Sequence, residues 1–260
     1  MNAEEYVKLA EVEDRMWYFR SVHAHVRREL LATLGSGRKR PENASPASGS
    51  GPVVLDAGCG TGGLMLRLSA AEPRWKLCGI DQNPLACELA RRRCGPGTPI
   101  REGSVTAMPY DHRAFDAVVS VDVVCQVEEP ARVVAEFFRV LRPGGVVVIN
   151  VPAYRWMWSY HDEAVHTRKR YTRTEVAHLL RQAGFRLTRL THWNALPFPL
   201  VWAKRKIFPR SGATSDVRDY PGVVDAVLLG MMAVEHAWLE AGGSWAWGTS
   251  ILAVAHKSPE

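Results

Sequence analysis

The sequence is poor in cysteine and has no long apolar run. Its five cysteines are odd in number and form no Cys-x-x-Cys pair, which argues against a disulfide framework and against the usual zinc patterns. We therefore expect reduced thiols, no metal site and a cytoplasmic location. The opening residues do not resemble a signal peptide, and no uninterrupted apolar stretch is long enough to span a bilayer.

Neither charge nor size singles out one class of partner. The formal net charge of +6 permits attraction to anionic substrates, nucleic acid or a membrane surface, and establishes none of them. A hydrophobic content of 47% and a charged content of 23% are ordinary for a globular protein. The 260 residues suffice for one large α/β domain with an insertion, but are few for two full domains.

A glycine-rich turn within residues 53–63 is the organising feature of the chain. Val53, Val54 and Leu55 predict a buried strand, and the leucine-rich residues 64–68 predict the start of a helix. Glycine lets the backbone between them turn sharply and approach a bound molecule closely. The stretch therefore predicts a ligand cradle between a strand and a helix.

Two cofactor classes use such a cradle. Gly58, Gly60 and Gly63 fit the dinucleotide fingerprint, and Asp81 lies about 20 residues on, where a ribose-binding acid belongs. Asp56 argues against NAD, because its carboxylate would face the pyrophosphate in a poorly screened site. A cationic cofactor without phosphate, such as S-adenosylmethionine, suits the position better. A nicotinamide-dependent oxidoreductase is the alternative.

These residues resemble the class I S-adenosylmethionine-dependent methyltransferases, whose first motif reads D-x-G-x-G-x-G. Asp56, Gly58, Gly60 and Gly62 match that motif in full. The resemblance implies a Rossmann-like α/β fold: a seven-stranded, mostly parallel sheet with helices on both faces. It also implies S-adenosylmethionine as cofactor and S-adenosyl-L-homocysteine as product.

The resemblance further implies which residues hold the cofactor. Asp81 would accept hydrogen bonds from the ribose hydroxyls, and Ser104 would meet the adenine amino group. Arg20, next to the aromatic run 16–19, would meet the cofactor carboxylate. Their alternatives are a helix cap for Asp81 and a surface arginine for Arg20. The predicted cofactor-binding set is Arg20, Asp56, Gly58, Cys59, Gly60, Gly62, Asp81, Gln82, Ser104, Val105 and Val121.

The chain divides into three predicted parts. Residues 1–34 predict a helical lid, residues 35–52 a flexible linker, and residues 53–260 the methyltransferase domain. Roughly 55 residues separate the sixth predicted strand, residues 185–192, from the seventh, residues 249–256. This interval is longer than a usual loop. We expect a helical insertion at 195–246 that walls the acceptor pocket. A dimer face or a membrane contact is the alternative.

Residues 152–171 follow the carboxyl end of the fifth predicted strand, residues 146–151, and are rich in aromatic and basic side chains. They resemble a P-x-x-x-x-W-x-x-H-D-x-x-x-x-H-x-R-x-Y stretch of bacterial small-molecule methyltransferases of the type 11 group. His161 and His166 are the predicted catalytic residues, as acceptors of a substrate proton. Their alternative is a structural hydrogen-bond network with Asp162. The predicted substrate contacts are Tyr154, Trp158, His161 and Tyr171.

The sequence thus predicts a cytoplasmic methyltransferase that modifies oxygen or nitrogen of a small biosynthetic or natural-product intermediate, with carbon as second choice. A lipid-linked or peptide substrate, RNA, or a non-catalytic S-adenosylmethionine-binding role are the alternatives. Nucleic acid is not the expected partner. A monomer, a homodimer and a peripheral membrane contact all remain open.

Overall fold

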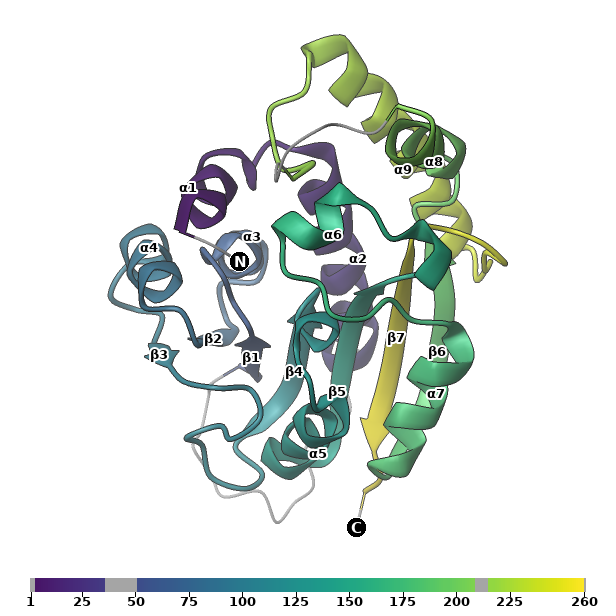
Figure 1. Cartoon of the computed structure of the whole chain (residues 1–260). Coiled ribbons are helices and arrows are strands. Elements are labelled where there is room, and N and C mark those ends of the chain that lie inside the picture. Colours follow the sequence, from purple (N-terminus) through teal and green to yellow (C-terminus); the bar gives the residue numbers. More distant parts are fainter. Residues whose placement is uncertain (1–2, 36–50, 209–214, 260) are drawn as a thin grey trace.

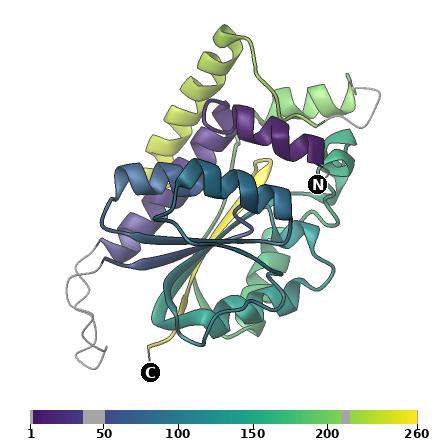
Figure 2. The ribbon, with the colours of Figure 1, turned by 90° about the vertical axis from the view of Figure 1, so that its left-hand side faces the viewer.

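The computed structural model describes residues 3–35, 51–208 and 215–259. A twisted sheet lies at the centre of the described chain, with helices on both faces (Figures 1 and 2). Most of the predicted linker, residues 36–50, lies outside the described residues.

The sheet has seven strands in the order β3-β2-β1-β4-β5-β7-β6. Strand β7 runs antiparallel to both neighbours, whereas the pairings among β1 to β5 are parallel. This confirms the predicted Rossmann-like, mostly parallel sheet. The strands are β1 Val53–Ala57, β2 Lys76–Asp81, β3 Ile100–Glu102, β4 Phe115–Val121, β5 Leu141–Pro152, β6 Phe185–Trp193 and β7 Ser250–Lys257.

The helices begin where local signals place them. Asn83 caps one helix by accepting a hydrogen bond from the Ala86 amide at 3.1 Å, and Thr172 with Glu175 forms a capping box on another. The α-helices are α1 Ala3–Val12, α2 Trp17–Leu34, α3 Gly63–Ala71, α4 Pro84–Cys94, α5 Pro130–Val140, α6 Tyr160–Ala164, α7 Arg173–Gln182, α8 Phe198–Lys206 and α9 Gly222–Glu240. Short 3₁₀ turns occupy Val124–Gln126 and Arg155–Met157.

Alternation along the strands builds a separate core on each face of the sheet. Val54 of β1 packs in a cluster with residues of α2, α3, α4 and α9, whereas its neighbour Leu55 packs with residues of α5 and α7. Successive side chains of a strand point to opposite faces, so a sheet covered on both sides needs nearly continuous apolar strands.

The Arg-Pro-Gly-Gly stretch at 142–145 has a composition typical of a turn. It nevertheless lies inside β5, which already begins at Leu141. Leu141 pairs with Phe115 of β4, and the register then shifts before Ala117 pairs with Val146. The turn residues therefore form an irregularity within a longer strand.

The predicted insertion between β6 and β7 contains α8 and α9. Helix α9 packs against α2, and the Asp225 carboxylate accepts a hydrogen bond of 2.9 Å from the Trp17 amide. The N-terminal helices and the insertion therefore support each other above the carboxyl ends of the parallel strands (Figure 1).

Candidate active site

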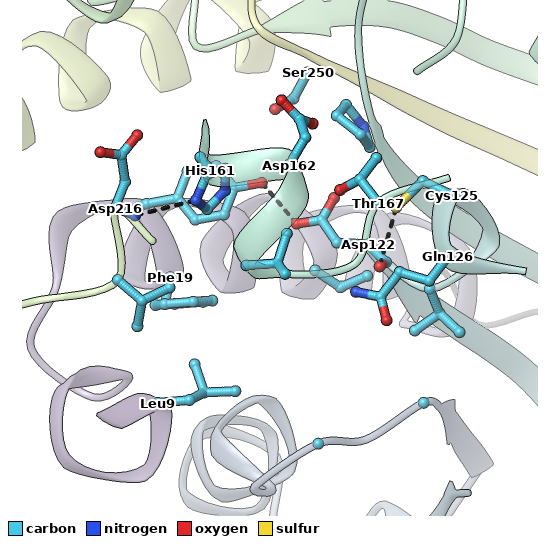
Figure 3. A pocket seen from close by; sticks show the side chains of 18 of the residues that line it. Leu9, Phe19, Asp122, Cys125, Gln126, His161, Asp162, Thr167, Asp216 and Ser250 are labelled. Atoms are coloured by element: carbon cyan, nitrogen blue, oxygen red, sulfur yellow. Dashed lines mark hydrogen bonds between the residues drawn. The ribbon is translucent and has the colours of Figure 1, made fainter. Parts of the chain in front are cut away.

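A cavity of about 630 Å³ opens at the carboxyl ends of β1, β2, β4 and β5. Its wall combines the glycine turn, the loops after these strands, and residues of α1, α2, α6, α8 and α9. Figure 3 shows Leu9 of α1 across from Asp122 and His161. Because parallel strands end at one edge of the sheet, residues distant in sequence meet here.

The glycine turn forms the floor of the cavity. The amides of Gly58 and Cys59 donate to the Ile80 carbonyl at 2.8 and 3.0 Å. Gly58 has a φ of +88°, and a Cβ at this position would lie 2.2 Å from the Val123 side chain. Both the backbone conformation and the close approach of the next loop therefore require glycine here.

Replacing Gly58 with alanine is expected to lower the free energy of unfolding by about 2–3 kcal/mol, because positive φ and a steric clash act together. Gly97→Ala is the matched control, since a Cβ there would meet nothing within 4 Å. Chemical unfolding of both variants measures the difference. Equal stability of the two variants would contradict the steric role of Gly58.

Gly62 serves helix packing. Its φ is +87°, it lies outside the cavity lining, and a Cβ there would lie 2.8 Å from the Cys94 sulfur. Glycine at this position lets α3 approach α4, and the predicted cofactor contact of Gly62 stays a prediction. Gly58, Cys59 and Gly60 do line the cavity.

Three carboxyl groups surround the turn. Asp56 is 5% exposed, lines the cavity, and makes no side-chain hydrogen bond to any described residue. Burial, reinforced by Glu13 and Asp81, raises the pKa of Asp56 to about 8. A buried carboxyl group without a partner, facing a cavity, fits a cationic ligand and disfavours a pyrophosphate.

Asp81 ends β2 and fixes the turn. Its Oδ2 accepts a hydrogen bond of 3.0 Å from the Gly60 amide, and its Oδ1 accepts one of 2.9 Å from the Asn83 amide. Burial raises its pKa, and these amide donors oppose the shift. Each carboxylate oxygen keeps lone-pair capacity toward the cavity.

Glu13, which sequence reasoning missed, is the third acid. Its Oε2 accepts hydrogen bonds from Thr61 Oγ1 at 2.6 Å, the Gly63 amide at 3.1 Å and Arg93 Nη1 at 2.7 Å. Burial raises its pKa. The residue joins the segment between α1 and α2 to the glycine turn, so the N-terminal helices and the cradle form one site.

The pKa of Asp56 predicts proton release on cofactor binding. At about pH 7 the free protein holds a proton on Asp56, and a bound cation would favour the ionised form. Affinity for S-adenosylmethionine is therefore expected to rise with pH up to about 8. Calorimetry in buffers of different ionisation enthalpy measures the released proton. Asp56→Asn is expected to abolish the release, and a proton release unchanged in that variant would contradict the assignment.

The remaining predicted cofactor residues divide between wall and surface. Gln82, Ser104, Val105 and Val121 line the cavity. Arg20 is exposed and lies outside the lining, so the structure does not bring its guanidinium to the site. The adjacent aromatic residues Trp17, Tyr18 and Phe19 do line the cavity.

Asp122, directly after β4, is a further carboxyl group in the cavity lining. Its Oδ2 accepts a hydrogen bond of 2.8 Å from the Tyr18 hydroxyl, and its Oδ1 accepts one of 2.8 Å from Asn150 Nδ2. Burial raises its pKa to about 6, partly offset by these two donors. Its φ of +57° is unusual for a residue with a side chain. The one sequence signal for Asp122 is its place directly after the fourth predicted strand.

His161 of α6 lines the cavity as a neutral imidazole. Its Nδ1 accepts a hydrogen bond of 3.1 Å from the Asp216 amide, so the proton of the neutral ring is on Nε2. Burial and Arg205 lower its pKa to about 3. Both facts disfavour the predicted role as proton acceptor.

The other predicted catalytic and substrate residues lie outside the cavity lining, and their roles stay predictions. His166 is exposed, with its amide bonded to the Glu163 carbonyl. Tyr154 stacks on His192, and the Tyr171 hydroxyl bonds the Val124 carbonyl inside the core. Trp158 lies on the surface. Within the described parts of the chain, no three His, Cys, Asp or Glu side chains form a group able to hold a metal.

Residues 55–149 match the family model described as a methyltransferase domain. The match runs from β1 into β5 and includes the glycine turn, Asp81 and Asp122. The chain carries a class I S-adenosylmethionine-dependent methyltransferase domain. The prediction drawn from the first motif, including its cofactor, is confirmed.

Sequence relatives share this domain. The 24-methylenesterol C-methyltransferase 2 of Oryza sativa subsp. japonica is 31% identical over 171 residues, covering 60% of this chain and 47% of that protein. A protein of Mycolicibacterium smegmatis named as a probable S-adenosylmethionine-dependent methyltransferase is 34% identical over 140 residues, covering 52% of each. The chain spans about half the length of these relatives.

A solved structure shares the methyltransferase fold. The geranyl diphosphate C-methyltransferase of Streptomyces coelicolor A3(2), in complex with S-adenosyl-L-homocysteine, has a TM-score of 0.58 at 16% identity. The alignment covers 90% of the present chain and 76% of the geranyl diphosphate C-methyltransferase. At this identity the likeness shows the fold.

Proposed function

We propose that the protein transfers a methyl group from S-adenosylmethionine to a small acceptor with an apolar body. The observation that carries the proposal is one cavity with two chemically different halves. The turn after β1 supplies acids suited to a cation, and α8 and α9 supply apolar side chains beside the polar His161 and Asp216. In the sheet, β4 lies between β1 and β5, so Asp122 stands between the two halves.

The cofactor half is assigned to acidic, small polar and apolar residues that line the cavity around the glycine turn. Asp81 would hold the ribose hydroxyls. Ser104 and Val105 would contact the edge and the face of the adenine. Asp56 and Glu13 would lie near the positively charged end of the cofactor. Bound S-adenosylmethionine would supply an electrophilic methyl group on a sulfonium. The acids then lower the free energy of the charged ligand before transfer, and water is excluded by α1 and α2.

On the acceptor side, Asp122 is proposed to take the proton that the acceptor loses. As the acceptor atom takes the methyl group, the methyl–sulfur bond would break to leave S-adenosyl-L-homocysteine, the acceptor's bond to hydrogen would break, and the proton would move to the Asp122 carboxylate. Tyr18 and Asn150 fix the orientation of that carboxylate through the hydrogen bonds described above. His161 would donate its Nε2 hydrogen to a polar atom of the acceptor.

The apolar wall narrows the acceptor class. The apolar residues that line this half are Leu200 and Val201 of α8, Val224 and Leu228 of α9, and Val217 between these helices. Lys204, Arg205 and Asp216 line the same half and pair with one another. Such a surface favours a hydrophobic body carrying one reactive polar group. Oxygen or nitrogen is the first candidate for the methylated atom. Carbon is the second, because the sterol relative and the geranyl diphosphate neighbour are both named C-methyltransferases.

A labelled-methyl assay tests the proposal. Purified protein and S-adenosylmethionine radiolabelled in the methyl group would be incubated with apolar and polar metabolite extracts. The expected result is protein-dependent label in the apolar fraction, with formation of S-adenosyl-L-homocysteine. Saturable cofactor binding without label in either fraction would instead support a non-catalytic binding protein.

The five cysteines are free thiols in the structure, which supports the proposed cytoplasmic location.

A further inference from the structure

Helix α9 has its polar and apolar faces reversed relative to an ordinary surface helix. From Val223 to Trp238, every exposed position carries an apolar residue or glycine. These positions are Val223, Val224, Ala226, Val227, Gly230, Ala233, Val234, Ala237 and Trp238. A surface helix of a water-facing protein normally turns its charged residues outward and its apolar residues toward the core.

Two acidic residues of α9, Asp225 and Glu235, point inward instead, whereas Glu240 at the end of the helix is exposed and pairs with His236. Glu235 is fully buried, and its Oε2 accepts hydrogen bonds from the amides of Ala195 at 2.8 Å and Leu196 at 3.2 Å. The carboxylate of Asp225 accepts from the Trp17 amide. These contacts fasten the inner face of α9 to α2 and to the end of β6.

The outer face is therefore the unusual one. Contrary to the sequence prediction, α9 is by length and composition able to cross a membrane: an 18-residue window has a mean hydropathy of 1.4, yet only 22% of that window is buried in the structure. Val223 is 79% exposed and Val234 is 64% exposed. Spanning a bilayer would pull Glu235 and Asp225 away from their amide partners, so the contacts favour a helix that lies in the interface.

Aromatic and basic residues extend this surface. Helix α8 lies at the same end of the molecule as α9 (Figures 1 and 2), and exposes Trp202 and, just beyond its end, Ile207 and Phe208. Lys206, at the end of α8, is exposed. Lys204 and Arg205 of α8 pair with Asp216 and line the cavity, and the whole chain has a formal net charge of +6. Apolar rings beside positive charge match the anionic interface of a bilayer.

We propose that the outer face of α9, together with the end of α8, docks on the surface of an anionic lipid bilayer without spanning it. The net charge of +6 favours an anionic bilayer over a second copy of this chain, which would bring like charges together. A further consequence rests on the proposed function. Val224 and Leu228 of α9 line the cavity, so an apolar acceptor could reach the site from the membrane.

Vesicle flotation tests the docking face without requiring methyl transfer. The full chain would be mixed with vesicles of phosphatidylcholine alone or of equal parts phosphatidylcholine and phosphatidylglycerol. Binding is expected to the anionic vesicles, and to weaken as salt rises. Val227→Glu with Val234→Glu is expected to lower the bound fraction about tenfold or more, because neither charge has a partner in the bilayer.

Val7→Glu is the matched control, because Val7 is also exposed, at 45%, but lies on α1. It should leave vesicle binding unchanged. Circular dichroism and S-adenosylmethionine binding would verify that all variants are folded. Failure of the wild-type chain to float with anionic vesicles would overturn the proposal. So would a lipid-free dimer that the Val227→Glu, Val234→Glu variant converts to monomer. Either result leaves the cofactor assignment and the labelled-methyl assay untouched.

Discussion

Asp122→Asn is expected to lower kcat for methyl transfer about 10²–10⁴-fold, because the amide cannot accept the proton that the acceptor loses. Asparagine has nearly the same shape, so cofactor affinity should change little. The rate of the wild-type enzyme should fall as pH falls below about 6, where the Asp122 carboxylate becomes protonated. Steady-state kinetics with the acceptor found in the labelled-methyl assay would measure both effects.

Tyr18→Phe separates proton transfer from a merely structural role. The Tyr18 hydroxyl donates to Asp122 and stabilises its ionised form, so removal of that hydroxyl raises the pKa of Asp122. The acidic limb of the pH–rate profile should therefore move above 6. A profile that stays in place in Tyr18→Phe, or a kcat that survives in Asp122→Asn, would contradict proton transfer to Asp122.

Arg170→Met is expected to lower the free energy of unfolding by about 3–5 kcal/mol, because it leaves a buried carboxylate without its cation. Arg170 Nε donates to Asp162 Oδ1 at 2.8 Å, and the two side chains are 2% and 1% exposed. Arg170 Nη1 also donates to the Ala153 carbonyl at 2.8 Å. The pair therefore ties α6 to the end of β5.

Urea unfolding followed by circular dichroism would measure this effect. Adding Asp162→Asn to Arg170→Met should recover part of the loss, because the uncompensated charge disappears. Arg155→Met is the control: its ion pair with Glu175 is exposed and should contribute at most about 1 kcal/mol. Equal losses in Arg170→Met and Arg155→Met would contradict the role of burial.

Local patterns explain why much of the sheet was predictable. The apolar runs of β1 and β4 need burial on both faces, and the glycine turn between β1 and α3 leaves the backbone few alternatives. The positions of Asp56 and Asp81 follow directly from these elements, because each acid stands at or near a strand end. Both line the cavity as predicted.

Side-chain direction in the loops was not predictable in the same way. The motif at 152–171 placed a loop at the correct sheet edge, yet Tyr154 and Tyr171 turn toward protein contacts while His161 reaches the cavity. Glu13 reaches the glycine turn only through the packing of α1 and α2. Nothing in its neighbouring residues carries that information. Long-range packing decides such placements.

Calorimetry on the purified full chain tests the central claim most directly. The account predicts saturable heat with S-adenosylmethionine, with a dissociation constant of about 1–100 μM, as is usual for enzyme ligands. Asp81→Ala should weaken that binding about 30-fold, since it removes charged hydrogen bonds to the ribose and to the glycine turn. NAD should give no heat. Heat with NAD and none with S-adenosylmethionine or S-adenosyl-L-homocysteine would contradict the account.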